Sequence, residues 1–237
     1  MARIKYYDSV TQQWVYGDMA LQPPLPTGTA NGDILVWDNT NQEWVVKPKW
    51  QIHFQPVEYI ESTGTQRIDT GIKTTNGVII DFQYTSATND SSCFGAMTNN
   101  TTNRYDIIYY DGLYFSCGNG ADVSSEITGD ATRRILLEQG VTNQDLKIDG
   151  TTIATYPAFT NGCTYNTHLF ARKQGSSSYK YASVKIYSCK LYVDGTLQRD
   201  FVPCYRISDS VIGMYDTVNG VFYTNAGSGT FTKGADV

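Results

Sequence analysis

Residues 182–197 read ASVKIYSCKLYVDGTL, and this stretch decides the fold class. The run from Ala182 to Val193 is rich in β-branched and aromatic residues, which favour strands. It ends at Asp194-Gly195, a dipeptide that suits a type I′ hairpin turn because both of its central residues need positive φ. The stretch therefore predicts a β-strand followed by a tight reversal of the chain.

The same pattern of short β runs and turn dipeptides continues through the main part of the chain. The other turn dipeptides are Asn76-Gly77, Asp111-Gly112, Asp149-Gly150, Asn161-Gly162 and Asn219-Gly220. The other β runs are 57–60, 67–72, 78–84, 92–97, 105–110, 112–117, 134–138, 145–148, 152–156, 168–172, 211–215 and 221–224. This pattern predicts an all-β fold, an antiparallel two-sheet sandwich or a barrel. Residues 131–141 favour a strand but would also suit a short helix.

Composition agrees with an all-β protein and excludes several classes of function. The 237 residues include 21 glycines and 18 tyrosines but only 17% charged residues, which argues against a helical bundle or a disordered chain. The net charge of −5 argues against the strongly basic surface of a nucleic-acid-binding protein and against a polybasic membrane-binding segment. No apolar run is long enough for a membrane-spanning helix, so we expect no membrane insertion. The first residues are not followed by the apolar segment of a secretory signal, so we expect no signal peptide.

A repeat marks the N-terminal segment. The motif of residues 4–15 returns at residues 34–45. Both copies read Ile-x-x-aromatic-Asp-x-x-x-Gln-x-Trp-Val, where x is any residue. Each copy predicts a hairpin whose turn opens on an Asp that accepts hydrogen bonds from backbone N–H groups. A lone hairpin is marginal in water, so its large aromatics must be buried. The hairpins either pack on each other or on the main domain, or they are buried against another copy or a larger assembly. The aromatics concerned are Tyr7, Trp14, Trp37 and Trp44.

The chain divides by composition into three parts. Residues 23–26 read PPLP, an extended and semi-rigid spacer between the two copies of the repeat. We expect residues 1–50 to form an anchor and assembly segment, 51–56 a linker, and 57–237 the main domain.

Several stretches of the main domain resemble a known module. They are YIESTGTQRIDTG at 59–71, KIYSCKLY at 185–192, GTLQRDFVPC at 195–204, VIGMYD at 211–216 and FYTNAGSGTF at 222–231. Together they resemble the concanavalin A-like, laminin-G-like sandwich found in bacterial surface proteins and in bacteriophage tail-fibre and head-fibre proteins. Residues 32–45 are similar to segments of phage fibre and virion attachment proteins. The resemblance implies a jelly-roll topology of two curved sheets.

The resemblance also implies a function. It implies a bacteriophage virion protein, a component of a tail fibre, a baseplate or a head fibre, which we expect to be non-enzymatic because catalytic motifs are missing. Residues 1–50 would bind other virion proteins and form a homotrimer, and residues 57–237 would recognise a host-surface glycan, with avidity from several copies. The expected location is the virion, after assembly in the host cytoplasm. Two alternatives stay open: a structural virion decoration or adaptor without a ligand, and a glycoside hydrolase.

Residues 103–111 and 172–179 contain the residue types that bind sugars. Aromatic rings can contact the apolar face of a sugar, and amide and charged side chains can bond to its hydroxyls. The candidate ligand-binding residues in them are Asn103, Arg104, Tyr109, Tyr110, Asp111, Arg172 and Tyr179. In a strand, however, Tyr105, Ile107 and Tyr109 share one face, which would also suit a core.

A metal site has little support in the sequence. Calcium stays open as a cofactor, because Asn89, Asp90, Asp106 and Asp111 could contribute oxygens, but no DxDxDG-like loop is present. Solvated turn carboxylates are the simpler interpretation. The five cysteines show no CxxC spacing, so we expect reduced thiols in strands more than zinc ligands or disulfides.

A catalytic site also has little support. Retaining glycosidases need two carboxylates about 5 Å apart. Glu58 and Glu61 lie three residues apart, which puts them on opposite faces of a strand. His53 and His168 suit structural roles, and no Gly-x-Ser-x-Gly elbow is present. We therefore expect no enzymatic activity.

Overall fold

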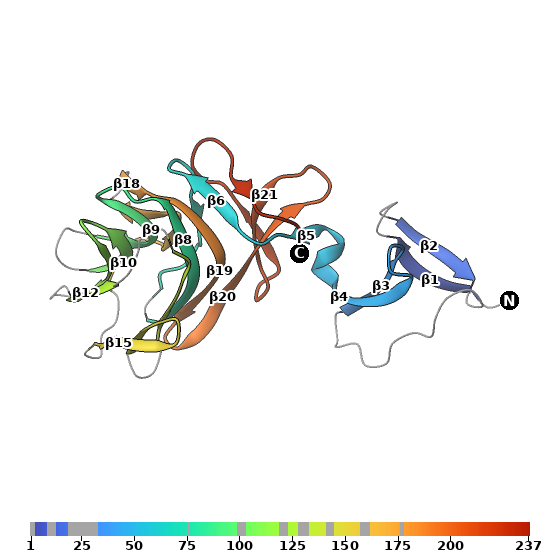
Figure 1. Cartoon of the computed structure of the whole chain (residues 1–237). Coiled ribbons are helices and arrows are strands. Elements are labelled where there is room, and N and C mark those ends of the chain that lie inside the picture. The colour runs from blue at the N-terminus through green and yellow to red at the C-terminus, as the bar shows by residue number, and fades with distance from the viewer. Residues whose placement is uncertain are drawn as a thin grey trace. The chain divides into compact units, whose positions relative to one another are not determined.

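The structure is a computed structural model that describes residues 3–8, 13–18, 33–74, 76–98, 103–118, 123–127, 133–140, 145–156, 162–175 and 178–237. The chain divides into two compact units, Met1–Gln55 and Pro56–Val237. Strands make up both units (Figure 1). Among the described residues, no helix is long and apolar enough to cross a membrane.

The first unit holds a four-stranded sheet in the order β2–β1–β3–β4. Its elements are β1 (Arg3–Asp8), β2 (Gln13–Asp18), β3 (Asp33–Asp38), β4 (Glu43–Pro48) and the 3-10 turn η2 (Lys49–Ile52). The two copies of the repeat form equivalent hairpins, with Tyr7 opposite Trp14 and Trp37 opposite Trp44. β1 and β3 join the hairpins in parallel, with Tyr7 opposite Val36. The hairpins therefore pair with each other, which was one of the expected arrangements.

The turn of the second hairpin confirms the predicted role of its Asp. The Asp38 carboxylate accepts hydrogen bonds from the backbone N–H of Thr40 at 2.8 Å and of Asn41 at 3.3 Å. These bonds hold the pKa of Asp38 below its usual value. Trp37 and Trp44 are both buried and meet edge to face, with ring centroids 5.3 Å apart. The side chains of Tyr7 and Trp14 lie outside the described residues.

The second unit is built from two sheets, which we call the small sheet and the large sheet. The small sheet contains β7 (Ile68–Asp69), β9 (Ser91–Met97), β10 (Arg104–Tyr109), β11 (Leu113–Gly118), β12 (Val123–Ile127), β16 (His168–Leu169), β17 (Ala171–Gln174) and β18 (Ser178–Tyr181). The large sheet contains β6 (Ile60–Thr63), β8 (Val78–Ser86), β13 (Ile135–Gln139), β14 (Asp145–Ile148), β15 (Thr151–Thr155), β19 (Ser183–Val193), β20 (Thr196–Arg206), β21 (Ile212–Asp216), β22 (Val221–Thr224) and β23 (Thr232–Lys233). β5 (Phe54–Pro56) spans the boundary between the two units along the chain.

The order of strands shows an antiparallel sandwich. The small sheet runs β12–β11–β10–β9–β16–β7, and the large sheet runs β15–β14–β13–β8–β19–β20–β21–β22. Neighbours on both of these paths are antiparallel, whereas β17 runs parallel to its neighbour β9 and pairs with β18 on its other side. The all-β class and the antiparallel sheets are thus confirmed. The jelly-roll topology and the anchor role of residues 1–50 stay predictions.

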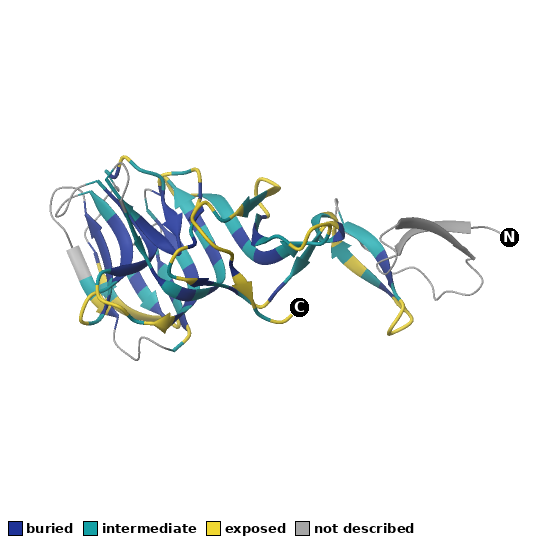
Figure 2. Cartoon of the chain, turned by 90° about the horizontal axis from the view of Figure 1, so that it is seen from above, coloured by how far each residue is buried: buried dark blue, intermediate teal, exposed yellow. Residues whose placement is uncertain are grey.

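The core of the second unit lies between the two sheets, where buried residues of both sheets gather (Figure 2). Many of its side chains are aromatic. Tyr105 meets Phe94 and Phe115 edge-on, with ring centroids 5.7 and 5.4 Å apart. Its hydroxyl donates a 2.7 Å hydrogen bond to Gln139 Oε1 on the large sheet. This hydrogen bond gives the fully buried Tyr105 the partner that a buried hydroxyl needs.

The turn dipeptides behave as predicted at two places and differently at three others. Both residues have positive φ at Asp149-Gly150 and Asp194-Gly195, as a type I′ turn requires. Only one residue does so at Asn76-Gly77, Asp111-Gly112 and Asn219-Gly220, and Asn161 lies outside the described residues. The ambiguous stretch contains the strand β13 over Ile135–Gln139, so the strand interpretation is confirmed there.

Candidate ligand-binding site

The candidate site lies on the face of β10 that points away from the core. Strand alternation puts Tyr105 and Ile107 in the core, where both are fully buried. Arg104, Asp106 and Ile108 occupy the opposite face. Asp106 is nevertheless fully buried, so its charge needs partners within the protein.

Neighbouring strands bring polar groups to this face of the small sheet. Asp106 lies opposite Gly95 of β9 and Ser116 of β11. Arg172 of β17 lies opposite Lys180 of β18. Because β17 runs beside β9, the site combines segments that are 66 residues apart in the chain.

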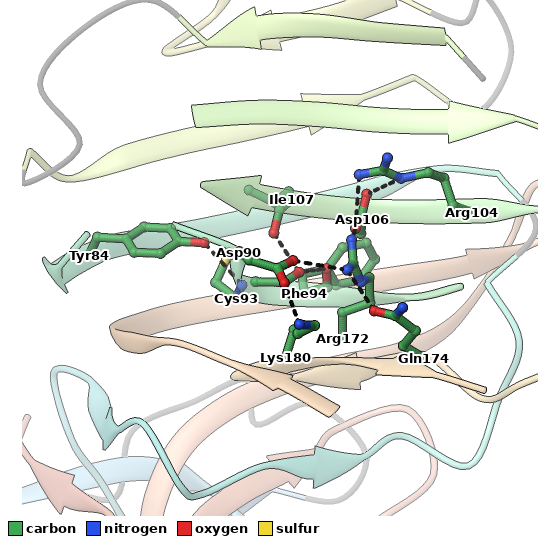
Figure 3. Close-up of polar contacts among 11 residues, drawn as sticks. Tyr84, Asp90, Cys93, Phe94, Arg104, Asp106, Ile107, Arg172, Gln174 and Lys180 are labelled. Atoms are coloured by element: carbon green, nitrogen blue, oxygen red, sulfur yellow. Dashed lines mark hydrogen bonds and ion pairs between the residues drawn. The ribbon is translucent and has the colours of Figure 1, made fainter. Parts of the chain in front are cut away.

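A buried ion pair forms the floor of the site (Figure 3). Arg172 Nη1 donates to Asp106 Oδ2 at 2.6 Å, and the two side chains are 4% and 0% exposed. Arg104 Nε donates to Asp106 Oδ1 at 3.1 Å from the other side. Arg172 Nη2 donates to Gln174 Oε1 at 3.0 Å. Asp106 is thus held by two guanidinium groups, which compensate the cost of its burial.

Asp90 supplies a second, outer carboxylate. It comes directly before β9 with a φ of 65°, and its backbone N–H donates to Tyr109 O at 2.9 Å. Lys180 Nζ donates to Asp90 Oδ2, and Arg172 Nη2 lies 3.5 Å from Asp90 Oδ1. The Asp90 side chain is 42% exposed, so this carboxylate faces both the protein and solvent.

Gly95 allows the strands to approach each other beside Asp106. Its φ of +135° lies in a region that residues with side chains rarely adopt. A Cβ at this position would lie 2.4 Å from Asp106 Cβ and 2.4 Å from Tyr105 O. The close pairing that places Asp106 under Arg172 therefore requires glycine here.

These side chains line an open groove with a volume of about 510 Å³, a size suited to a small ligand. The groove is lined by Asp90, Met97, Arg104, Ile108, Tyr110, Tyr114, Ser116, Arg172, Gln174 and Lys180. Tyr110 is 59% exposed, and Tyr114 is half-buried. The groove therefore combines aromatic rings with hydrogen-bond donors and acceptors.

The structure brings three of the seven predicted ligand-binding residues together. Arg104, Tyr110 and Arg172 line the groove. Tyr109 packs against the core instead, with its ring 6.4 Å from that of Tyr84. It shares the strand face of the buried Tyr105 and Ile107, which is the alternative that the sequence left open.

The other three predicted residues lie elsewhere. Asp111 sits in an exposed turn, where its carboxylate accepts from Asn89 Nδ2 at 2.7 Å. Asn103 has a φ of 55°, and its carbonyl accepts from the N–H of Thr98. Tyr179 packs under the guanidinium of Arg67, 4.0 Å from its ring centroid. None of the three lines the groove among the described residues.

Sequence analysis missed several groove residues, for two different reasons. Tyr114 and Ser116 alternate with the apolar Leu113, Phe115 and Cys117, so the period of the β11 strand could have assigned them to the outer face. The sequence carries no comparable signal for Gln174 and Lys180, because strand register places them there. Asp90 was considered only as a calcium ligand.

The residues considered for calcium do not suit a cation as arranged. Asp90 and Asp106 are held by the basic groups of the groove. Asn89 and Asp111 bond to each other, since Asp111 N–H also donates to Asn89 Oδ1 at 3.0 Å. Within the described part of the chain, no three His, Cys, Asp or Glu residues gather as a metal site.

The cysteines and the described histidine of the sandwich are buried parts of the fold. All five cysteines are buried and none forms a disulfide. Four of them lie in strands, as expected, and Cys163 does not. Burial raises the pKa of the Cys204 thiol to about 12, so it stays protonated and unreactive at neutral pH. His168 is 1% exposed; burial lowers its pKa, and its Nδ1 lies 2.9 Å from Asn166 O.

Comparison with known proteins returns no match: no protein-family model fits the chain, and no curated protein or solved structure matches it. The similarity to the concanavalin A-like module therefore stays a prediction from the sequence.

Proposed function

We propose that the second unit is a non-catalytic saccharide-binding module whose ligand lies in the groove of the small sheet. The combination of exposed Tyr110 and half-buried Tyr114 with Arg, Lys, Gln, Ser and Asp side chains supports this proposal. A sugar ring has an apolar face that packs on aromatic rings and hydroxyls that need donors and acceptors. An open groove of this size suits one or a few sugar units.

The state of the carboxylates supports binding without catalysis. A glycosidase needs one carboxyl group as a proton donor and another as a nucleophile or base. Asp106 is fully buried and held by Arg104 and Arg172, and Asp90 is held by Lys180. Asp106 is buried beneath the groove, so Asp90 is the one carboxylate among the described lining residues, and a single carboxylate does not make the pair that a glycosidase needs.

For the whole chain, we propose a virion adhesin in which residues 1–50 bind other virion proteins and trimerise. The paired hairpins of the repeat and the resemblance to phage fibre segments support this part of the proposal. Several copies on one particle would convert weak binding in each groove into strong adhesion. Immunogold labelling of purified phage particles tests the location, and label at no particle would overturn it.

A glycan array probed with the full chain tests the binding proposal. We expect binding to at least one saccharide, with about tenfold or greater loss in Tyr110→Ala because one sugar-stacking ring is removed. Tyr192→Ala, on β19 of the large sheet, removes a tyrosine outside the groove and serves as the matched control. Absence of binding to every saccharide, or equal loss in both variants, would count against the groove as a saccharide site.

A further inference from the structure

The groove carries more positive charge than the protein around it. Arg104, Arg172 and Lys180 line it, opposed by the carboxylate of Asp90 alone among the lining residues. The buried Asp106 below offsets one more of these charges, which still leaves an excess of one cation. The chain as a whole has a net charge of −5. A basic groove in an acidic protein favours an anionic ligand.

Asp90 marks the position that an anionic group would take. Its carboxylate lies over Arg172 and Lys180, but the contact with Arg172 Nη2 is long, at 3.5 Å. The side chain is 42% exposed, so it can turn into solvent without leaving a buried charge behind. A ligand carboxylate, sulfate or phosphate could replace it on the same two cations.

Arg172 retains hydrogen-bonding capacity at this position. The side chain is 4% exposed, yet its Nε has no hydrogen-bond partner among the described residues. A buried donor without an acceptor is costly, and a guanidinium binds oxyanions best through two parallel N–H groups. Nη2 already lies 3.5 Å from Asp90 Oδ1, so an anion in place of Asp90 would meet the edge of the guanidinium that Nη2 and Nε share.

We propose that the saccharide bound in this groove is acidic, and that its anionic group replaces the carboxylate of Asp90 on Arg172 and Lys180. This inference rests on the proposed saccharide-binding function and specifies the class of sugar. It also predicts that Asp90 competes with the ligand, so that the groove binds acidic sugars better when Asp90 loses its charge.

The experiment uses the full chain and a set of paired saccharides. The set contains uronic-acid, sialylated, sulfated and phosphorylated oligosaccharides, each beside its carboxyl-reduced, desulfated or dephosphorylated counterpart. We expect the bound members to be acidic and to lose about tenfold or more in affinity when neutralised. Binding to a neutral member as strong as to its acidic partner would overturn the inference and leave the saccharide proposal standing. Failure to bind any member would overturn the saccharide proposal itself.

Two substitutions outside the buried pair test the role of Asp90. Asp90→Asn should raise the affinity for the acidic saccharide by about three- to tenfold, because one competing charge is removed, and leave neutral sugars unaffected. Lys180→Gln should lower the same affinity by a similar factor. Lys147→Gln, on β14 of the large sheet, is the matched control and should change nothing. A lower affinity in Asp90→Asn would show that Asp90 contacts the sugar directly and would refute the replacement.

Discussion

Asp106→Asn is the most informative single change, because it removes the charge that compensates Arg172 while preserving the shape of the side chain. Asp106 is fully buried and accepts from Arg172 Nη1 at 2.6 Å and from Arg104 Nε at 3.1 Å. Removing one partner of a buried ion pair typically costs about 3–5 kcal/mol, since the other charge is left in a dry environment. The variant should therefore lose about 3–5 kcal/mol of unfolding free energy, or roughly 6–20 °C in the melting temperature of a domain of this size.

Two spectroscopic signals localise the effect. All four tryptophans lie in residues 1–50, so tryptophan fluorescence reports on the first unit. The tyrosine-rich sandwich is followed by near-ultraviolet circular dichroism in the same urea titration. Asp106→Asn should shift the dichroism transition and leave the fluorescence transition in place.

The matched control is Asp236→Asn, which breaks an exposed ion pair with Lys233 of 2.6 Å. A surface pair of this kind contributes less than about 1 kcal/mol. If Asp106→Asn shifted the dichroism transition no more than this control, the floor of the groove would not depend on the buried pair. A shift in the fluorescence transition alone would also contradict the argument.

Two further predictions concern the packing and the pH dependence of the sandwich. Gly95→Ala should cost about 1–3 kcal/mol more unfolding free energy than Gly195→Ala, measured by thermal unfolding. Both glycines have positive φ, but Gly195 has open space around it, whereas a Cβ at Gly95 would collide with Asp106. Equal losses in the two variants would mean that only the backbone angle matters. The pKa of Cys204 is raised from 9.0 to about 12 by burial, so its contribution to stability is complete below pH 9 and is lost as the pH rises toward 12. The unfolding free energy should fall with pH in this range, and Cys204→Ala should reduce the slope by about 1.4 kcal/mol per pH unit; an unchanged slope would contradict the assignment.

The repeat shows which features the local sequence predicts and which it does not. The hairpins and the Asp38 turn follow from the motif, because a turn is decided by residues that are neighbours in the chain. The parallel pairing of β1 with β3 does not follow from the motif, because it joins strands that a long connection separates. In the sandwich, most of the predicted β runs lie within two residues of observed strands, whereas no predicted run matches β12, β18, β20 or β23.

The groove residues also divide into those that the sequence predicted and those that only the structure placed. Arg104, Tyr110 and Arg172 were identified by residue type, because basic and aromatic side chains suit ligand contact anywhere on a strand. Tyr109 and Tyr179 have the same chemistry and lie outside the groove. Which tyrosine faces the groove depends on the strand face and on the register of the neighbouring strand, neither of which residue type reveals.

The sequence by itself determined the all-β class and the hairpin repeat, since alternation and turn chemistry act over a few residues. Only the tertiary structure decided that Arg172 lies over Asp106, 66 residues away, with Lys180 and Asp90 beside it. That assembly depends on the placement of β17 beside β9 and on the close approach that Gly95 allows. Such contacts are set by the packing of whole strands, so no short stretch of sequence specifies them.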